Sequence, residues 1–219
     1  MKIVLIDLFS GLGGFAEAFK RTGFVIEKHY FSEIDRHAIA NYKYNNPNAE
    51  YIGSVGDVSG TEIRRKHPNS TIIVTGGFPC QDISIAGKRK GFEPGTRSSL
   101  LSEAVRIIFE CKPQIFIIEN VKGLSSIDEG TGIVKTIGLL TYLNTDRPQY
   151  TVECQLLHTK WVLPQNRERY YFVGHSRSGS STKVFPITEN DCRVNEGASN
   201  ATTVRTLTGG AIREGCTAV

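Results

Sequence analysis

A cysteine in an unusual setting offers the clearest chemistry in this sequence. Cys80 follows Pro79 in the run Thr75-Gly-Gly-Phe-Pro-Cys80, just after an apolar stretch with the length of a strand. Structural cysteines usually belong to apolar core elements, as Cys111 and Cys154 do, whereas this one falls where a loop would present it. The setting therefore favours a nucleophilic thiolate over a packing residue.

A carboxylate and two arginines could serve the same site. Glu119 follows the apolar run Gln114–Ile118. Arg167 and Arg169 stand two residues apart at the start of the last predicted strand, where alternate side chains share a face. Either arginine alone would be typical surface charge. If the strands that precede Cys80 and Glu119 are neighbours in one sheet, Cys80 and Glu119 converge on one cleft.

A glycine-rich turn follows the first apolar run of the chain. Gly11, Gly13 and Gly14 lie in the segment Asp7-Leu-Phe-Ser-Gly-Leu-Gly-Gly-Phe15, where they allow a sharp turn and a close backbone approach at the start of a helix. The spacing is not that of the dinucleotide fingerprint, so the turn alone is equally typical of a tight strand-to-helix connection.

Acidic residues after the second and third predicted strands favour a nucleoside-binding site. Glu33 lies about 20 residues beyond the glycines, where this architecture places a carboxylate on ribose hydroxyls, and Asp35 competes with it for that role. Asp57 follows a weaker strand signal near Tyr51 and Ile52. It could accept a hydrogen bond from an adenine amino group, although an aspartate in such a position is more often a helix N-cap.

The elements that must position these residues alternate between strands and helices. Apolar runs of strand length cover 2–8, 24–31, 70–75 and 114–118, and helix-like stretches cover 15–20, 36–44, 98–110 and 133–143. Two later strands, 151–158 and 169–174, follow each other closely. The pattern predicts an α/β fold with a doubly wound, mostly parallel sheet, of the Rossmann-like kind, which binds ligands at the carboxyl ends of its strands.

Length and composition limit what can accompany this domain. The 219 residues suit one α/β domain over 1–175, followed by a Ser/Gly-rich and polar stretch over 176–219 that reads as a linker or the start of an incomplete second region. A net charge of +4 permits a polyanionic partner without requiring one. The five cysteines form no C-x-x-C pair that would indicate a metal, and no apolar run approaches the ~20 residues of a membrane span. We therefore expect a cytoplasmic protein without a metal.

Taken together, these motifs closely resemble the cytosine-C5 DNA methyltransferase family. Asp7–Phe15 is similar to its first cofactor motif, and Glu33 and Asp57 are similar to its second and third. Phe78-Pro79-Cys80-Gln81 matches the nucleophile motif, and Glu119-Asn120-Val121 and Gln165-x-Arg167-x-Arg169 match the remaining catalytic signatures in the family's order. The resemblance covers Met1 to about Gly174, which is most of the chain.

The resemblance implies S-adenosylmethionine as the cofactor, within the methyltransferase fold, and no metal. The residues that it assigns to the cofactor pocket are Phe9, Ser10, Gly11, Gly13, Gly14, Glu33, Ile34, Asp57, Val58, Phe78 and Pro79. Ile34 departs from the pattern, because many members carry an aromatic residue there against the adenine. That stacking contact is missing here.

The resemblance also implies a mechanism and a DNA partner. Cys80 would add to C6 of a cytosine flipped out of double-stranded DNA, which activates C5 toward the cofactor's methyl group. Glu119 would hold N3 and the exocyclic amine, Arg169 the O2 edge, and Arg167 would orient Glu119. The residues assigned to DNA contact are Gln81, Ser84, Lys88, Arg89, Lys90 and Gln165, of which the three basic ones lie in a long glycine-containing loop.

Two other functions stay open at this stage. One is a methyltransferase-like subunit that binds DNA or a partner chain without catalysis, and the other is a cysteine hydrolase that pairs Cys80 with His158 or His175. The family's later segments are not recognisable, because the echo at Arg205-Thr-Leu207-Thr208 lacks its glutamate. We therefore expect a catalytic half whose target-recognition domain and closing helix come from a longer chain or a second one. The recognised DNA sequence is not encoded in any motif found.

Overall fold

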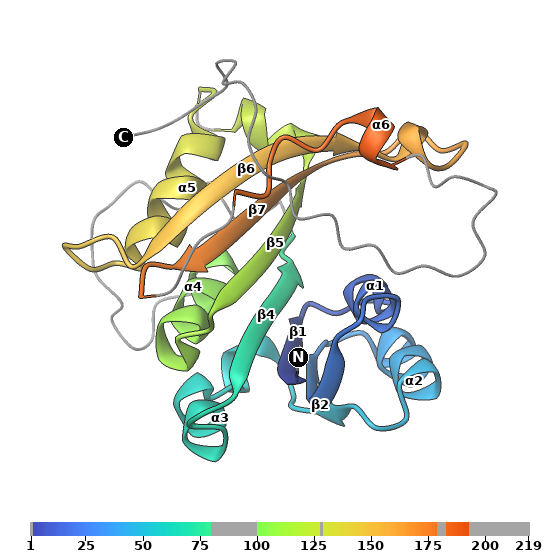
Figure 1. The fold of residues 1–219 in the computed structure, drawn as a ribbon, viewed down its shortest axis with the longest axis vertical. Helices are drawn as coiled ribbons and strands as arrows, with labels where there is room; N and C mark the ends of the chain where they lie inside the picture. The colour runs from blue at the N-terminus through green and yellow to red at the C-terminus, as the bar shows by residue number, and fades with distance from the viewer. Residues whose placement is uncertain (1, 80–99, 128, 179–182, 193–219) are drawn as a thin grey trace.

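The computed structural model describes residues 2–79, 100–127, 129–178 and 183–192, and a twisted sheet runs through its centre (Figure 1). Its strands lie in the order β3-β2-β1-β4-β5-β7-β6. They are β1 (Lys2–Leu8), β2 (Val25–Ser32), β3 (Glu50–Tyr51), β4 (Thr71–Gly77), β5 (Ile115–Val121), β6 (Tyr150–His158) and β7 (Glu168–Ser176). Neighbouring strands from β3 to β5 run parallel, and β7 runs antiparallel to both β5 and β6. The predicted mostly parallel, doubly wound sheet is confirmed.

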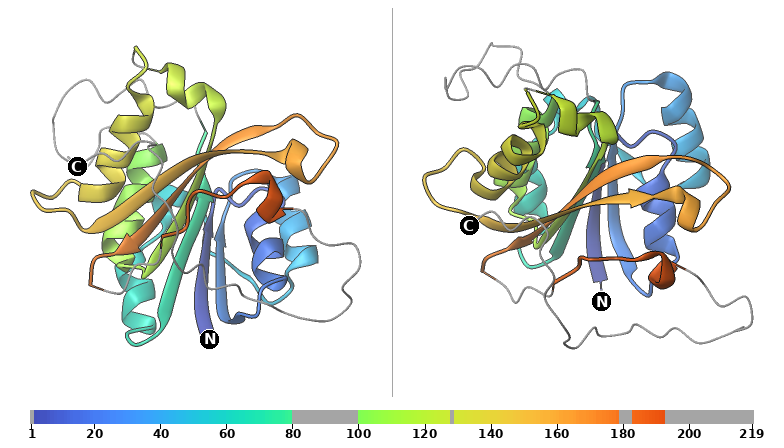
Figure 2. Two further views of the ribbon diagram at one scale, coloured as in Figure 1. Left: turned by 45° about the horizontal axis from the view of Figure 1, so that its top comes forward. Right: turned by 90° about the horizontal axis from the view of Figure 1, so that it is seen from above.

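Helices cover both faces of this sheet (Figure 2). They are α1 (Gly14–Lys20), α2 (Arg36–Asn45), α3 (Gly60–Lys66), α4 (Leu100–Cys111), α5 (Gly132–Tyr142) and the short α6 (Glu189–Cys192). Single turns of 3-10 helix occur at η1 (Val55–Asp57), η3 (Lys122–Ser126) and η4 (Thr159–Trp161). The helices α1 and α2 lie on one face, and α3, α4 and α5 lie on the other.

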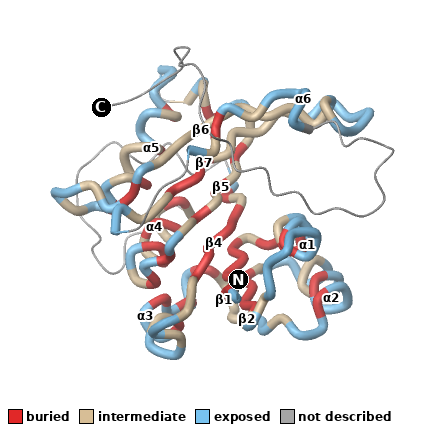
Figure 3. Tube along the Cα trace, in the orientation of Figure 1, coloured by how far each residue is buried: buried red, intermediate tan, exposed pale blue. Residues whose placement is uncertain are grey.

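The alternation of side chains along the strands explains this two-sided cover. Val4 and Ile6 of β1 pack in the large cluster with α4, while Ile3 and Leu5 pack on the opposite face with Phe19 of α1. All four β1 side chains have no exposed surface. Figure 3 shows the same burial along β1, β4 and the inner side of α4. Strands apolar on both faces are the signature of a parallel sheet between helix layers.

The antiparallel strand β7 follows from the short connection 159–167 that joins it to β6. A parallel return would need a crossover of a dozen or more residues, so the chain turns back as a hairpin and inserts between β6 and β5. Gly174 makes room for this insertion, because a Cβ there would collide with the Phe116 ring of β5. The strands predicted near the end of the domain are thus confirmed as a hairpin.

The sequence reading overlooked α3. Its N-cap is Ser59, whose side chain accepts a hydrogen bond from the backbone N–H of Glu62 at 3.2 Å. Asp57 therefore does not cap a helix but lies in η1 just before it. The serine followed three residues later by glutamate is a recognisable start signal, although a seven-residue helix offers little periodicity to support it.

The chain beyond β7 returns along β6 as far as the structure describes it. Glu153 accepts hydrogen bonds from the backbone N–H groups of Val184 and Phe185, and Gln155 makes two bonds with the backbone of Ile187. These side chains hold 184–187 against the sheet before α6 begins. The division of the chain at residue 175 stays a prediction.

Candidate active site

The predicted site residues gather where the parallel strands end and where β7 begins. Phe9 to Gly13 connect β1 to α1, Glu33 follows β2, and Phe78 follows β4. Glu119 stands near the end of β5, directly beside the end of β4 in the ladder, where it pairs with Gly77. One edge of the sheet thus brings together segments from across the sequence, as the fold class predicts.

The conformation of the glycine turn requires glycine at two of its three glycine positions. Gly11 has φ 51° and Gly13 has φ 91°, and a Cβ on Gly13 would lie 3.1 Å from the Tyr42 ring. Phe9 also adopts a positive φ of 51°, which is uncommon for a residue with a side chain. Gly14 has an ordinary conformation, and a Cβ there would meet nothing within 4 Å. Its lack of a side chain leaves open space beside the turn.

Glu33 ties this turn to the end of β2. One carboxylate oxygen accepts a hydrogen bond from the Gly11 N–H at 2.8 Å, and the other accepts from the N–H groups of Ile34 and Asp35 at 2.7 and 3.0 Å. The Asp35 carboxylate is engaged elsewhere, since it accepts from the N–H groups of His37 and Ala38 as the N-cap of α2. Of the two acids, Glu33 is the one that touches the glycine turn.

A buried hydroxyl in the same turn lacks a partner. Ser10 is 8% exposed, and its Oγ makes no hydrogen bond within the described part of the chain, while its N–H donates to the Ser32 carbonyl at 3.0 Å. Buried polar atoms are nearly always paired, so this oxygen is suited to a ligand. Ile34, two residues after the end of β2, is 78% exposed.

The third predicted cofactor segment forms a turn after β3. Asp57 is exposed, whereas Val58 is buried in the core cluster of α3 and α4. The carbonyls of Val55 and Val58, on either side of Asp57, accept hydrogen bonds from Arg106 of α4 at 3.1 and 2.9 Å. This turn is therefore held from outside by a side chain that the sequence reading did not single out.

The predicted acid and arginines meet. Arg169 Nε lies 2.8 Å from Glu119 Oε1, and Arg167 Nη2 lies 3.5 Å from the same oxygen. Glu119 and Arg169 are each about one fifth exposed, at 18% and 20%, and Arg167 is 49% exposed. Arg169 is thus the closer and better buried partner, while Arg167 faces solvent beside it. Both arginines lie close to the Glu119 carboxylate, and the role of Arg167 in orienting it stays a prediction.

A side chain of β5 holds the segment that leads from β4 to the predicted nucleophile. Asn120, 1% exposed, donates a hydrogen bond from Nδ2 to the Phe78 carbonyl at 3.0 Å. Phe78 is buried, and Pro79 is exposed. Cys80 itself lies outside the described residues, as do Gln81, Ser84 and the basic run 88–90. Asn120 was quoted only as part of a motif, and its contact with the Phe78 carbonyl is not visible in the sequence.

The connection 159–167 presents the last predicted residues. Gln165 is exposed, and its carbonyl accepts a hydrogen bond from the Thr159 hydroxyl at 2.7 Å. The same hydroxyl accepts from the Arg167 N–H at 3.0 Å. Thr159 thereby shapes the turn before Arg167, a role that no sequence pattern announced.

Neither candidate histidine forms a partner site of the hydrolase kind among the described residues. His175 pairs with Ile115 at the amino end of β5, on the opposite edge of the sheet from Glu119. His158 accepts a hydrogen bond from the Lys160 N–H through Nδ1 at 3.2 Å.

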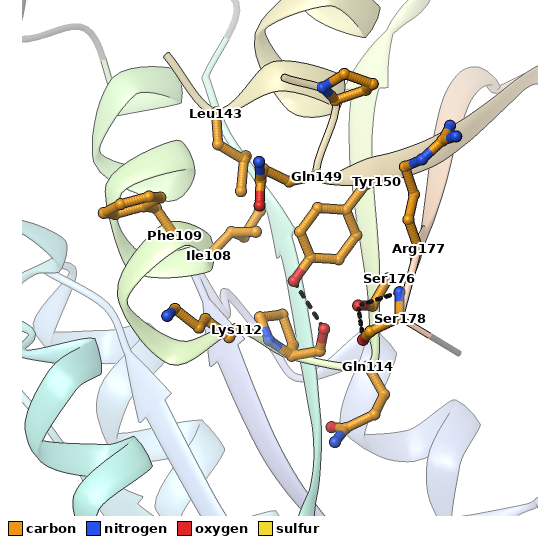
Figure 4. A pocket seen from close by; sticks show the side chains of 12 residues that line it. Ile108, Phe109, Lys112, Gln114, Leu143, Gln149, Tyr150, Ser176, Arg177 and Ser178 are labelled. Carbon is orange, nitrogen blue, oxygen red and sulfur yellow. Dashed lines mark hydrogen bonds between the residues drawn. The ribbon is translucent and has the colours of Figure 1, made fainter. Parts of the chain in front are cut away.

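A pocket also lies at the other end of the sheet from the predicted site residues, where β5 begins. Figure 4 shows it between the end of α4, the start of β6 and the end of β7, with Tyr150 donating to the Pro113 carbonyl at 2.7 Å. None of the predicted site residues lines it. Among the described residues, no group of histidines, cysteines and acids could hold a metal ion, and no helix is long and apolar enough to cross a membrane.

Comparison with known proteins identifies the family. The sequence profile of the C-5 cytosine-specific DNA methylases matches residues 3–216. This chain belongs to the C-5 cytosine-specific DNA methylase family. The resemblance to this family that the sequence motifs indicated is confirmed.

Several relatives of this chain are named methyltransferases. The type II methyltransferase M1.ScrFI of Lactococcus lactis subsp. cremoris is 42% identical over 182 residues, which are 82% of this chain and 43% of the relative. The orphan methyltransferase M.Rho11sI of Bacillus phage rho11s is 38% identical over 174 residues, 79% of this chain and 33% of the relative. The chain thus spans between a third and a half of these relatives.

A solved structure supports the same fold for this chain. It is a crystal structure described as a DNA modification methyltransferase encoded within an E. coli prophage. The TM-score is 0.61 at 27% identity, covering 86% of this chain and 53% of that one.

Proposed function

We propose that this protein transfers a methyl group from S-adenosylmethionine to C5 of a flipped cytosine in DNA, through a covalent bond between Cys80 and C6. The observation that carries the proposal is the fixed carboxylate of Glu119. It is held by Arg169, and it stands on the strand that hydrogen-bonds, through Asn120, to the segment just before Cys80. Membership of the C-5 cytosine-specific DNA methylase family supports the same reaction.

The glycine turn and its neighbours fit S-adenosylmethionine. The unpartnered buried hydroxyl of Ser10, the open space at Gly14 and the carboxylate of Glu33 offer a polar cradle with room for a ligand. Glu33 accepts from the ribose hydroxyls, and Asp57 accepts from the adenine amino group. The bound cofactor supplies an electrophilic methyl group. Phe9 lies in the same turn as this cradle, where an aromatic face would stabilise a sulfonium by roughly 0.5–2 kcal/mol.

The protein's own groups activate the cytosine. The Cys80 thiolate forms a bond to C6, and the electrons released to the ring make C5 nucleophilic. Glu119, protonated or sharing a proton with the ring, donates to N3 and accepts from the exocyclic amine, so that its proton stabilises the negative charge that develops on the ring during addition. Arg169 keeps this carboxylate in place and reaches toward O2, with Arg167 beside it. After methylation, loss of the C5 proton and cleavage of the C6–sulfur bond regenerate the thiolate.

The substrate is double-stranded DNA with one cytosine outside the stack, because C5 and C6 are inaccessible within it. Gln165 is available for this DNA on an exposed turn, and Gln81, Ser84, Lys88, Arg89 and Lys90 are proposed from the sequence. A second chain, or a further part of this one, supplies target recognition. The named relatives come from bacteria and a phage, and we propose the cell interior of such organisms as the place of action.

Covalent trapping tests the proposal. Duplex DNA carrying 5-fluorocytosine, which cannot release its C5 substituent, is incubated with the protein and S-adenosylmethionine, and the adduct is resolved on a denaturing gel. We expect an adduct that disappears in Cys80→Ser and persists in the matched control Cys154→Ser. An adduct that survives in Cys80→Ser would refute the assignment of the nucleophile. Cofactor binding without any adduct or methylation would instead support a binding subunit that lacks catalysis.

A further inference from the structure

Arg106 makes an unusually complete set of hydrogen bonds from the middle of α4. Its Nε and Nη2 donate to Glu103 Oε2 at 2.9 and 2.7 Å, and its Nη1 donates to the Glu110 carboxylate at 3.0 Å. Nη1 also donates to the Val58 carbonyl at 2.9 Å, and Nη2 to the Val55 carbonyl at 3.1 Å. Every nitrogen of the guanidinium is therefore engaged.

The two carbonyls bracket a single turn of chain. Val55 begins η1, Asp57 ends it, and Val58 follows, so that Arg106 holds both ends of the turn that carries Asp57. Within the turn, the Val58 N–H donates to the Val55 carbonyl at 3.3 Å and the Asp57 N–H donates to the Ser54 carbonyl at 2.9 Å. The guanidinium adds a second hydrogen bond to the Val55 carbonyl and one to the Val58 carbonyl, and these two bonds tie the turn to α4.

Neighbouring carboxylates fix the guanidinium in turn. Glu103 and Glu110 lie one turn of helix before and after Arg106, and the three side chains are only 17–24% exposed. Glu110 also accepts a hydrogen bond from the N–H of Gly60, the first residue of α3, at 2.8 Å. The planar fork of arginine suits this arrangement, whereas a lysine ammonium could not reach two carboxylates and two carbonyls at once.

We propose that Arg106 is a positioning residue for recognition of the cofactor's adenine, acting through the turn Val55–Val58 that presents Asp57. The inference rests on the proposed function, since it assumes that Asp57 receives the adenine amino group. Arg106 does not touch the cofactor. It sets the direction in which the exposed Asp57 carboxylate points.

A second arginine provides a matched control. Arg64 of α3 also binds backbone carbonyls across the α3 and α4 pair, donating to Cys111 at 2.7 Å and to Lys112 at 2.8 Å. These carbonyls lie at the end of α4 that precedes β5, away from the carboxyl edge. Arg64→Lys therefore removes the same kind of bonds from the same helix pair without touching the Asp57 turn.

The test compares two ligands by calorimetry with the purified protein: S-adenosylhomocysteine, and its inosine analogue, in which a carbonyl replaces the amino group. We expect the wild type to prefer the adenosine ligand by at least about tenfold, because Asp57 accepts from an amino group and repels a carbonyl. In Arg106→Lys we expect adenosine affinity to fall by about tenfold and the preference to approach unity. Arg64→Lys should keep both values while lowering the unfolding temperature.

Further variants keep the outcome decisive if Arg106→Lys unfolds. Glu103→Gln weakens the anchor of the guanidinium and should reduce the preference partially. In an Asp57→Asn background, Arg106→Lys should no longer alter it, since the two residues act in series. An adenosine preference that is equal in Arg106→Lys and Arg64→Lys would overturn the inference. A wild type that binds neither ligand would overturn the proposed cofactor itself.

Discussion

The carboxylate of Asp7, near the end of β1, has no exposed surface, and its replacement should change how stability depends on pH. Oδ1 accepts a hydrogen bond from the Thr75 hydroxyl and Oδ2 accepts from the Tyr42 hydroxyl, each at 2.8 Å. Burial raises the pKa of Asp7 to about 7 against these two hydrogen bonds, which lower it. The perturbation is Asp7→Asn, which keeps the shape of the side chain and removes its titration.

The sign and size of the expected change in the free energy of unfolding follow from the raised pKa of Asp7. The native carboxyl keeps its proton up to about pH 7, whereas the unfolded one ionises near pH 3.8. The native state therefore binds more protons over this range, and the stabilisation is present below pH 3.8 and lost as the pH rises to 7. Between pH 5 and 8 the free energy of unfolding should fall by about 3 kcal/mol from this residue, and Asp7→Asn should abolish that fall.

The neighbouring His29 makes a contribution to stability with the opposite pH dependence. His29 Nε2 lies 2.8 Å from the Tyr42 hydroxyl, and burial lowers the pKa of His29 from 6.5 to about 4. Its stabilisation is present above pH 6.5 and is lost as the pH falls toward 4, so it offsets Asp7 in the wild type below about pH 6.5. Both proteins retain His29, so its contribution cancels in the difference between their free energies of unfolding.

Urea denaturation between pH 5 and 8 measures the effect. The free energy of unfolding of Asp7→Asn, minus that of the wild type, should rise by about 3 kcal/mol over this range. Asp146→Asn, which removes an exposed carboxylate instead of a buried one, serves as the control. A difference for Asp7→Asn that does not vary with pH would refute the reasoning, because it would mean that Asp7 is ionised in the native state throughout.

Two further substitutions test the site directly. Glu33→Ala should weaken binding of S-adenosylmethionine by about 1–3 kcal/mol, since the carboxylate that would bind the ribose is lost, and unchanged affinity in calorimetry would remove Glu33 from that role. Gly77→Ala places a Cβ 3.0 Å from Glu119 Oε2, so the carboxylate must shift against Arg169. We expect a lower rate of methyl transfer, with stability within about 1 kcal/mol of the wild type; a rate equal to that of Gly138→Ala, whose Cβ meets nothing within 4 Å, would contradict it.

The central strands were predictable because each carries its own evidence. Lys2–Leu8 forms β1 with the bounds that its apolar run indicated, and β4 and β5 pair in parallel as the helix between them required. β4 extends beyond its apolar run to Gly77, because its last two residues are glycines outside the apolar pattern, and β5 continues past the run 114–118 through Glu119 and Asn120 to Val121. Backbone pairing, which no side-chain pattern reports, continues through them.

The site was predictable as a set of residue types and not as a set of contacts. Glu119, Arg167 and Arg169 were expected to serve one site, and the ladder of β5 with β7 brings them together. The order of closeness differs from the expected roles, because Arg169 belongs to β7 itself whereas Arg167 precedes it on an exposed turn. The exposure of Arg167 follows from the start of β7 at Glu168, which leaves Arg167 on the preceding turn.

The contacts that hold the site together share a physical form that explains why sequence patterns miss them. Glu33 binds the backbone of the glycine turn, Asn120 binds the backbone before Cys80, and Arg106 binds the backbone around Asp57. In each case a side chain from one element satisfies a peptide group of a loop from another. A loop's peptide groups are the same for every sequence, so nothing in the loop identifies its partner. The partner itself reads as an ordinary polar residue until the fold brings it within hydrogen-bond distance. Candidate loops can therefore be found by their glycines and acids, but the residues that fix their geometry emerge only from the arrangement of the elements around them.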